Sequence, residues 1–363
     1  MAAADALTTE TLLARATSRV AGRVPGLALA VVDARGVRVA GGVGQADLAR
    51  GVPAGTGMVC PWFSMTKIVT ATVAMRAAEQ GLLDLDVPLF ARVPPLSHVR
   101  PADDARRITA RHLLTHTAGL PNPIPIAWIH PADRPGPDPD RFLDDLLARH
   151  GRLRSTPGAR SSYSNLGTLV LGVALAAVTR TPFVELVRDQ VLAPLGMRDT
   201  DFVYRPDMRE RAAVGYHPRF DPMRLLVPRW VQGRATGRWV SFRPLLLDGS
   251  AYGGLVGTLD DAARFLRMHL NDGELDGVRV LGARSAIAMR EITCPGARFD
   301  LGLGWFRPAD RRDADPAFVE HLGGGAGFFN VLRIYPTRGI GIVVMGNTTS
   351  YDIDSVARFA LEA

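Results

Sequence analysis

Strand-like segments lie near both ends of this 363-residue chain, whereas its middle has the pattern of helices. Near the N-terminus, Leu27–Val32 and Val37–Ala40 flank the turn-rich Asp33–Gly36 and predict a β-hairpin. Near the C-terminus, strands are expected over 303–306, 328–335 and 339–345. The simplest fold class is α/β plus all-α, with one antiparallel sheet built from both termini, flanked by helices, and an inserted helical subdomain.

This pattern also predicts a domain organisation. Residues 1–70 and 250–363 are expected to form the sheet domain. Residues 71–249 are expected to form a mainly helical inserted domain that carries Tyr163 and the variable loops. The expected helices cover 7–20, 64–80, 109–116, 141–149, 165–178, 182–192, 260–271 and 352–361, with Thr109 as a suitable N-cap.

Two segments of unusual composition interrupt the helices. The stretch 121–139 holds seven prolines in nineteen residues, which excludes a helix or a central strand and predicts an ordered surface loop. The stretch 217–243 holds six arginines against one acid, Asp221, at intervals that fit neither a helix face nor a strand face. We interpret it as a solvated, twisted excursion; the alternative is a cationic rim for an acidic substrate.

Charge and cysteine content limit the partners and the compartment. The net charge is +7, but no run of five basic residues occurs, so a nucleic-acid-binding tail is not expected. Cys60 and Cys294 are far apart in sequence and require no disulfide, which suits a reducing compartment. Neither a secretory signal nor an apolar stretch of membrane-spanning length is present, so no membrane association and a cytoplasmic location are expected.

The segment Ser64-Met-Thr-Lys67 is the first candidate for chemistry. It follows a loop with a proline and two aromatic residues and opens an apolar stretch that continues to Gly81, which predicts a helix beginning at or just before Ser64. Residues three apart share one helix face, so the Lys67 amine can reach the Ser64 hydroxyl. A serine beside an amine is a candidate nucleophile and base, although helices also carry S-x-x-K on solvated faces.

Lys67 is the only lysine in a chain that has 42 arginines. Arginine cannot release its proton in a protein, whereas a buried lysine can. The one lysine therefore stands where a deprotonatable amine is useful, which favours the catalytic interpretation.

Two further stretches suit the same chemistry. Tyr163-Ser-Asn165 precedes an apolar helix, so that Tyr163 either points into a cleft or packs the helix start. The glycines of His321-Leu-Gly-Gly-Gly325, which comes before the strand at Phe328, allow close approach to the backbone and expose N–H donors. The alternative for this stretch is a flexible turn into the strand.

Metal and cofactor chemistry finds little support in the sequence. His112 and His116 are four residues apart on one expected helix, but no carboxylate or cysteine is spaced to complete a metal site. Asp84 and Asp86 are expected to turn a loop rather than to act as an acid and base pair. A phosphate-binding G-x-x-x-x-G-K loop is excluded because there is no second lysine. We expect no metal and no cofactor.

In order along the chain, these motifs resemble those of the serine β-lactamase and penicillin-recognising superfamily. The resemblance is to the branch with class C β-lactamases, D-Ala-D-Ala carboxypeptidases, D-aminopeptidases and β-lactamase-like (family VIII) esterases. Tyr163–Asn165 is similar to its Y-x-N motif, and His321–Gly323 stands at its K-T-G or H-x-G motif. Further similar stretches are 113–120, 194–197 and 253–258, and the resemblance covers roughly residues 10 to 360.

The resemblance implies a role for each matching residue. Ser64 would be the nucleophile, and Lys67 and Tyr163 would share the roles of base and acid, with the Lys67 cation lowering the pKa of Tyr163. The amide of Asn165 would hold Lys67 or the substrate. The oxyanion hole would be the Ser64 N–H and a backbone N–H after His321, at Gly324 by the family's spacing. His321 would contact the substrate or the Tyr163 oxygen.

Two departures from the family pattern influence the expected substrate. Histidine at 321 replaces a permanent cation, which weakens the case for recognising a penicillin carboxylate, and the missing signal argues against cell-wall work. The sequence therefore predicts a serine hydrolase that acts on a small ester or amide through an acyl-Ser64 intermediate. An intracellular acyltransferase with the same first step, and a non-catalytic scaffold or binding protein with this fold, are the alternatives.

Overall fold

The computed structural model describes residues 8–20, 22–123, 128–221 and 227–362. Its main sheet has eight antiparallel strands in the order β14-β15-β16-β17-β18-β1-β2-β3. The sheet therefore combines strands from both ends of the chain, as predicted. Its strands are β1 (Gly26–Asp33), β2 (Val37–Asp47), β3 (Val52–Pro53), β14 (Phe299–Leu301), β15 (Phe306–Pro308), β16 (Val319–Gly325), β17 (Phe328–Tyr335) and β18 (Ile340–Gly346).

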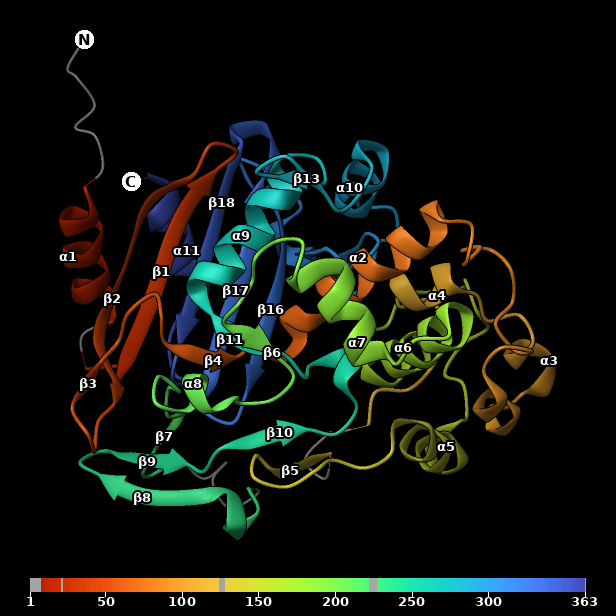
Figure 1. Cartoon of the computed structure of the whole chain (residues 1–363), viewed down its shortest axis with the longest axis horizontal. Coiled ribbons are helices and arrows are strands. Elements are labelled where there is room, and N and C mark those ends of the chain that lie inside the picture. Colours follow the sequence, from red (N-terminus) through yellow and green to blue (C-terminus); the bar gives the residue numbers. More distant parts are fainter. Residues whose placement is uncertain (1–7, 21, 124–127, 222–226, 363) are drawn as a thin grey trace.

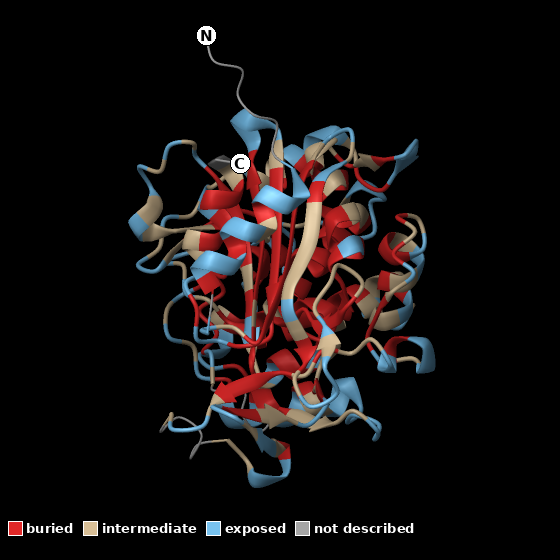
Figure 2. Ribbon diagram, turned by 90° about the vertical axis from the view of Figure 1, so that its left-hand side faces the viewer, coloured by how far each residue is buried: buried red, intermediate tan, exposed pale blue. Residues whose placement is uncertain are grey.

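Helices cover both faces of this sheet (Figure 1). Successive residues of a strand point to opposite faces. In β1, the larger Leu27, Leu29 and Val31 belong to the core with α1 (Thr9–Val20) and α11 (Ile353–Glu362). The smaller Ala28 and Ala30 belong to the core with α9 (Leu259–Leu270) and α2 (Thr66–Glu79). Because both faces are covered, the sequence of β1 is a nearly continuous apolar run. Figure 2 shows buried residues concentrated through the sheet.

A helical group lies beside the sheet, with α2 between them (Figure 1). Apart from Arg76, Ala78 and Glu79, every residue of α2 is buried, which is the pattern of a helix packed on nearly all sides. The other helices are α3 (Ala102–Ala105), α4 (Ala110–Leu114), α5 (Pro139–His150), α6 (Asn165–Thr179), α7 (Phe183–Val187), α8 (Pro206–Arg209) and α10 (Ala283–Arg290). The domain boundaries proposed at residues 70 and 250 stay a prediction.

Smaller sheets complete the structure described. One joins β4 (Val59–Pro61), β11 (Val256–Thr258) and β6 (Thr200–Asp201), and another joins β5 (Ile129–Pro131) and β10 (Leu245–Leu247). The remaining two contain β7 (Tyr216–Pro218), β9 (Trp239–Phe242) and β8 (Gln232–Thr236), and β12 (Glu274–Leu275) and β13 (Val278–Arg279).

The two segments of unusual composition are more ordered than the sequence predicts. The proline-rich stretch contributes β5, and the arginine-rich stretch contributes β8, β9 and a short 3-10 helix, η6 (Arg229–Val231). Proline at the end of β5 is compatible with a two-stranded sheet, where one edge needs no donor. Parts of both predictions, at 124–127 and 222–226, lie outside the described residues, as does the expected helix start at Leu7.

One predicted boundary is wrong. The expected strand 303–306 begins at Phe306, because Gly304 takes a positive φ that a strand does not accommodate. The expected helix 182–192 is helical from Phe183 to Leu192, although its second half, over 188–192, is a π turn. The glycines 323–325 are part of β16 itself, which excludes the alternative of a flexible turn into the next strand.

Within the described residues, no single helix has the length and apolar character needed to cross a membrane. One bent pair, α6 with 183–192, passes the same test by length and composition alone. Ten of the fifteen residues of α6 are buried in the protein, which is also the pattern of a core helix.

Candidate active site

Ser64 and Lys67 lie where the chain enters α2. Ser64 belongs to a 3-10 turn, η1 (Phe63–Met65), and α2 itself starts at Thr66, two residues later than predicted. Phe63, just before Ser64, has a φ of +47°, a left-handed conformation that is uncommon for a bulky residue. The Lys67 Nζ lies 3.1 Å from the Ser64 Oγ, so the two predicted residues are in contact.

Lys67 is buried and is surrounded by neutral groups. Its amine donates to the Asn165 Oδ1 at 2.8 Å and to the Tyr252 carbonyl oxygen at 2.6 Å. In the described part of the chain no carboxylate forms an ion pair with it. Burial without a counter-charge disfavours the ammonium form, and the pKa of Lys67 is therefore well below its usual value.

Tyr163 completes the group around the nucleophile. Its hydroxyl donates a hydrogen bond to the Ser64 Oγ at 2.7 Å. Burial raises the pKa of Tyr163, and the hydrogen bond to Ser64 opposes this only in part. The prediction that a Lys67 cation would lower the pKa of Tyr163 is wrong, because burial disfavours the charged form of the phenol and raises its pKa.

The start of the proline-rich segment holds Tyr163 and Asn165 in place. The Ser164 hydroxyl, which caps α6, donates to the Pro121 carbonyl at 2.8 Å, and the Asn165 backbone N–H donates to the Asn122 Oδ1 at 3.0 Å. Neither Asn122 nor the Tyr252 carbonyl was predicted from the sequence. A backbone oxygen belongs to every residue type and therefore forms no sequence motif. Asn122 lies among prolines that predict only a loop.

His112 and His116 have structural contacts of different kinds. The His112 Nδ1 accepts from the Thr109 N–H in a capping box at the start of α4, which confirms Thr109 as its N-cap. The His116 Nδ1 accepts from the Ser164 N–H at 3.2 Å, and its ring lies 4.7 Å from that of Tyr163. Burial lowers the pKa of His116 to about 3. Among the described residues, no group of three or more His, Cys, Asp or Glu could hold a metal ion.

Strand β16 brings His321–Gly323 against η1, the turn that contains Ser64. A Cβ on Gly323 would collide with the Trp62 carbonyl oxygen, so only glycine lets β16 lie this close to η1. Gly324 lines the cavity that contains Ser64. The buried His321 ring lies 6.3 Å from the Tyr163 ring, and its Nδ1 contacts the Leu322 carbonyl. No hydrogen bond joins His321 to Tyr163 within the part described, and burial holds the pKa of His321 well below its usual value.

A cavity of about 300 Å³ opens at Ser64, with Asn165 and Tyr252 also in its wall. Most of the remaining wall is apolar: Phe63, Ile129, Val227, Pro228, Val231, Phe242, Leu245, Leu247 and Ala326. His217 is the one titratable side chain besides Tyr252 among its described lining residues. The Ser64 hydroxyl therefore lies at a pocket that suits an uncharged group.

The fold and this site together are those of the serine β-lactamase and penicillin-recognising superfamily, as the motifs predicted. The beta-lactamase family model matches residues 10–363, and the chain belongs to this family. Membership makes the protein a serine hydrolase.

Relatives and solved structures agree with this assignment. The chain is 28% identical over 328 residues to D-alanyl-D-alanine-carboxypeptidase/endopeptidase AmpH of Escherichia coli (strain K12), covering 88% of this chain and 78% of that protein. It is 30% identical over 342 residues to Penicillin-binding protein 4 of Amycolatopsis lactamdurans, with 89% and 81% covered. The solved D-amino acid amidase of Ochrobactrum anthropi SV3 superposes with a TM-score of 0.79 at 24% identity over 97% of both chains, which shows the shared fold.

Proposed function

We propose that the protein cleaves a small, uncharged ester or amide through an acyl-Ser64 intermediate. The observation that carries this proposal is the contact of the Ser64 Oγ with both the Lys67 amine and the Tyr163 hydroxyl. A neutral amine has two N–H donors and one lone pair. Its two shorter contacts, to Asn165 and Tyr252, use the donors, which leaves the lone pair for the Ser64 proton.

The steps follow from this arrangement. The Ser64 Oγ attacks the substrate carbonyl carbon, and its proton passes to the Lys67 Nζ. The bond to the leaving oxygen or nitrogen breaks as that atom takes a proton from Tyr163, which recovers one from Lys67. Because the raised pKa of Tyr163 keeps its phenol protonated, the phenol serves as the acid of this step. Water then cleaves the acyl-Ser64 ester, and the Ser64 Oγ is protonated again.

The cavity also limits the substrate. The oxyanion that forms would lie between the backbone N–H groups of Ser64 and Gly324, both of which border the cavity. The apolar wall favours a neutral hydrocarbon or aromatic group beside the scissile bond. AmpH is named as a carboxypeptidase, but no arginine or lysine stands among the described lining residues to receive a peptide carboxylate at this position. A neutral ester or amide fits this cavity better.

The experiment is a substrate panel run beside the Ser64→Ala variant. The panel contains p-nitrophenyl esters of increasing chain length, D-amino acid amides, a D-Ala-D-Ala peptide and a chromogenic cephalosporin. We expect the neutral esters or amides to be cleaved faster than the peptide and the cephalosporin, and an acyl adduct on Ser64 in the intact mass. Equal turnover by Ser64→Ala, or no adduct during turnover of the best substrate, would contradict the mechanism.

An acyl acceptor other than water is the second candidate. The apolar cavity wall favours an alcohol over water next to the acyl-Ser64 carbonyl. If the protein is an acyltransferase, adding a primary alcohol will convert most of the hydrolysis product into a new ester. Release of free acid alone, at every alcohol concentration, would identify it as a hydrolase.

A further inference from the structure

A second and larger cavity adjoins the active-site cavity. It has a volume of about 790 Å³, and Ile129 of β5 lines both cavities. Its walls come from three stretches that are far apart in sequence. Its polar and aromatic lining residues are His130, Asp133, Arg134, Tyr204, Arg209, Trp230 and Arg243. We call it the outer cavity.

Three arginines in this wall have N–H donors that are not used in hydrogen bonds to the described residues. Within the described chain, the side chains of Arg134 and Arg243 have no hydrogen-bond or ion-pair partner, and Arg209 uses only its Nε, on the Tyr204 carbonyl at 3.1 Å. A guanidinium has five N–H donors. Among the described lining residues Asp133 is the one acid, and His130 forms an ion pair with Asp248 at 2.6 Å. The outer cavity therefore has an excess of positive charge.

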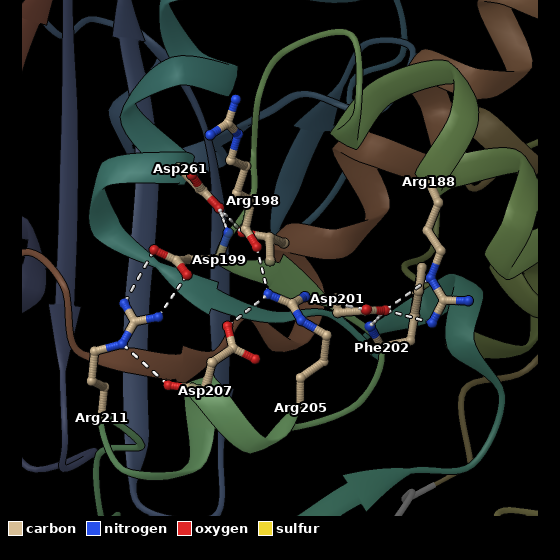
Figure 3. Close-up of polar contacts among 10 residues, drawn as sticks. Arg188, Arg198, Asp199, Asp201, Phe202, Arg205, Asp207, Arg211 and Asp261 are labelled. Carbon is tan, nitrogen blue, oxygen red and sulfur yellow. Dashed lines mark hydrogen bonds and ion pairs between the residues drawn. The ribbon is translucent and has the colours of Figure 1, made fainter.

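Three aspartates that precede Arg209 in the chain are already paired with other arginines (Figure 3). Asp199 binds Arg211 at 2.6 Å, and Asp207 binds Arg205 at 3.2 Å. Asp201 binds both Arg205 and Arg188, the latter at 2.6 Å. These pairs fix the segment that carries Tyr204 and Arg209, and they leave the Arg209 guanidinium without a carboxylate.

An exposed tryptophan supplies a flat apolar surface in the same cavity. Trp230 is 38% exposed, whereas Trp62, Trp128, Trp239 and Trp305 are all buried. Trp230 belongs to η6, and its neighbour Val231 is buried and lines the active-site cavity. One turn of the arginine-rich segment thus contributes to both cavities.

We propose that the outer cavity binds a small aromatic acid, with its carboxylate or phosphate held by Arg134, Arg209 and Arg243 and its ring against Trp230. Guanidinium groups hold both anions through paired N–H donors, and an exposed indole gains from covering its face with a ring. This binding does not depend on the chemistry proposed at Ser64.

The test measures binding to the folded full chain that carries Ser64→Ala, so that turnover has no part in it. The probes are phenyl phosphate and benzoate, with benzamide as the uncharged control. Binding is followed by the indole N–H resonance of Trp230, identified as the one lost in Trp230→Phe. We expect both anions, but not benzamide, to shift this resonance with saturation, and the tighter binder identifies the preferred anion.

Matched variants distinguish binding in the outer cavity from a general effect of positive charge on the protein. Arg209→Gln with Arg243→Gln is expected to weaken binding by roughly tenfold or more, because two charge-assisted contacts are lost. Arg229→Gln with Arg234→Gln removes the same amount of charge, but from residues of the arginine-rich segment that are outside the described cavity wall, and should leave binding unchanged. Thermal unfolding of each variant verifies that it is folded. Binding of benzamide as tight as benzoate, no saturable binding of either anion, or equal weakening by both double variants would overturn the proposal.

Discussion

Lys67 and Tyr163 owe their chemistry to the absence of charge around them. Lys67 is buried and Tyr163 is half-buried, each contacts the Ser64 Oγ, and the described partners of Lys67 are an amide, a hydroxyl and a backbone carbonyl. Burial lowers the pKa of Lys67 and raises that of Tyr163. Both shifts favour the uncharged forms that the proposed roles of base and acid require.

The substitution Lys67→Arg tests the proposed role of Lys67 as the base. Arginine keeps a positive charge but cannot accept the Ser64 proton, so we expect turnover to fall by about 10³-fold, within the range typical of lost base catalysis. The measurement is kcat for the best ester in the panel, with far-UV circular dichroism to verify folding. A folded Lys67→Arg protein that keeps a substantial part of its activity would remove Lys67 as the base.

The pH dependence of the reaction follows from the lowered pKa of Lys67. The amine is a base only when neutral, so kcat/KM should rise with pH through the pKa of Lys67 and then level off. Because burial holds that pKa well below the ordinary value of a lysine, the rise should be complete before an ordinary lysine deprotonates. The protonated phenol of Tyr163 should add no fall across neutral pH. A rate that still increases in proportion to hydroxide above pH 10 would contradict a depressed Lys67 pKa.

Much of this site could be predicted from residue type and spacing. Ser64, Lys67, Tyr163 and Asn165 were named from motifs, and they do lie together. The pKa of Tyr163 was predicted in the wrong direction because burial depends on packing by distant residues, which no local pattern records. The Tyr252 carbonyl was missed for a similar reason, since any residue type offers a backbone oxygen.

At the level of elements, the close approach of β16 to η1 determines whether the site can form. Glycine runs usually indicate turns, and this is why 323–325 were expected to enter a strand rather than to form one. The structure shows another reason for glycine at position 323. The Trp62 carbonyl oxygen occupies the space that a Cβ would need. Close approach between two elements is a tertiary property, and the sequence alone does not distinguish it from a turn.

Two neighbouring glycines of β16 give a matched test of this contact. Gly323→Ala would drive a Cβ into the Trp62 backbone, so we expect lower stability and loss of turnover as η1 is pushed away. In Gly324→Ala the close contact is with the side chain of Phe329, at 3.2 Å, which can move, whereas the Phe328 carbonyl oxygen lies at an ordinary 3.8 Å, so the stability should change little. Urea unfolding of both variants and of the wild type makes the comparison. Equal stability of the two variants would exclude the close approach as the reason for Gly323.

Across the whole molecule, the two ends of the chain are joined by more than strand pairing. Asn347, buried just after β18, accepts from the Gly26 N–H at 2.6 Å and donates to the Gln45 carbonyl at 3.0 Å. One side chain thus connects the ends of β18, β1 and β2. The antiparallel sheet shared by both ends was predictable from hydrophobic pattern, but this connection was not, because asparagine also suits turns.

The substitution Asn347→Ala should therefore destabilise the entire fold. It leaves the buried Gly26 N–H without its acceptor and removes two donated bonds, which predicts a loss of about 3 kcal/mol in the free energy of unfolding. Asn271→Ala, which removes a single exposed bond to the Ala34 carbonyl, should cost much less. Chemical unfolding gives both values. A cost for Asn347→Ala no larger than that for Asn271→Ala would show that strand pairing alone joins the ends.

The position of β1 inside the sheet has a consequence for how the protein is made. One neighbour of β1 is β2, which leaves the ribosome soon after it, but the other is β18, where Ile340 pairs with Asp33. At ordinary rates of translation, the apolar edge of β1 stays unpaired for roughly tens of seconds while the intervening chain is synthesised. An unpaired apolar strand is a template for wrong pairing, so the nascent chain needs shielding for most of its synthesis. Overexpression should thus yield insoluble protein more readily than the stability of the finished fold would suggest.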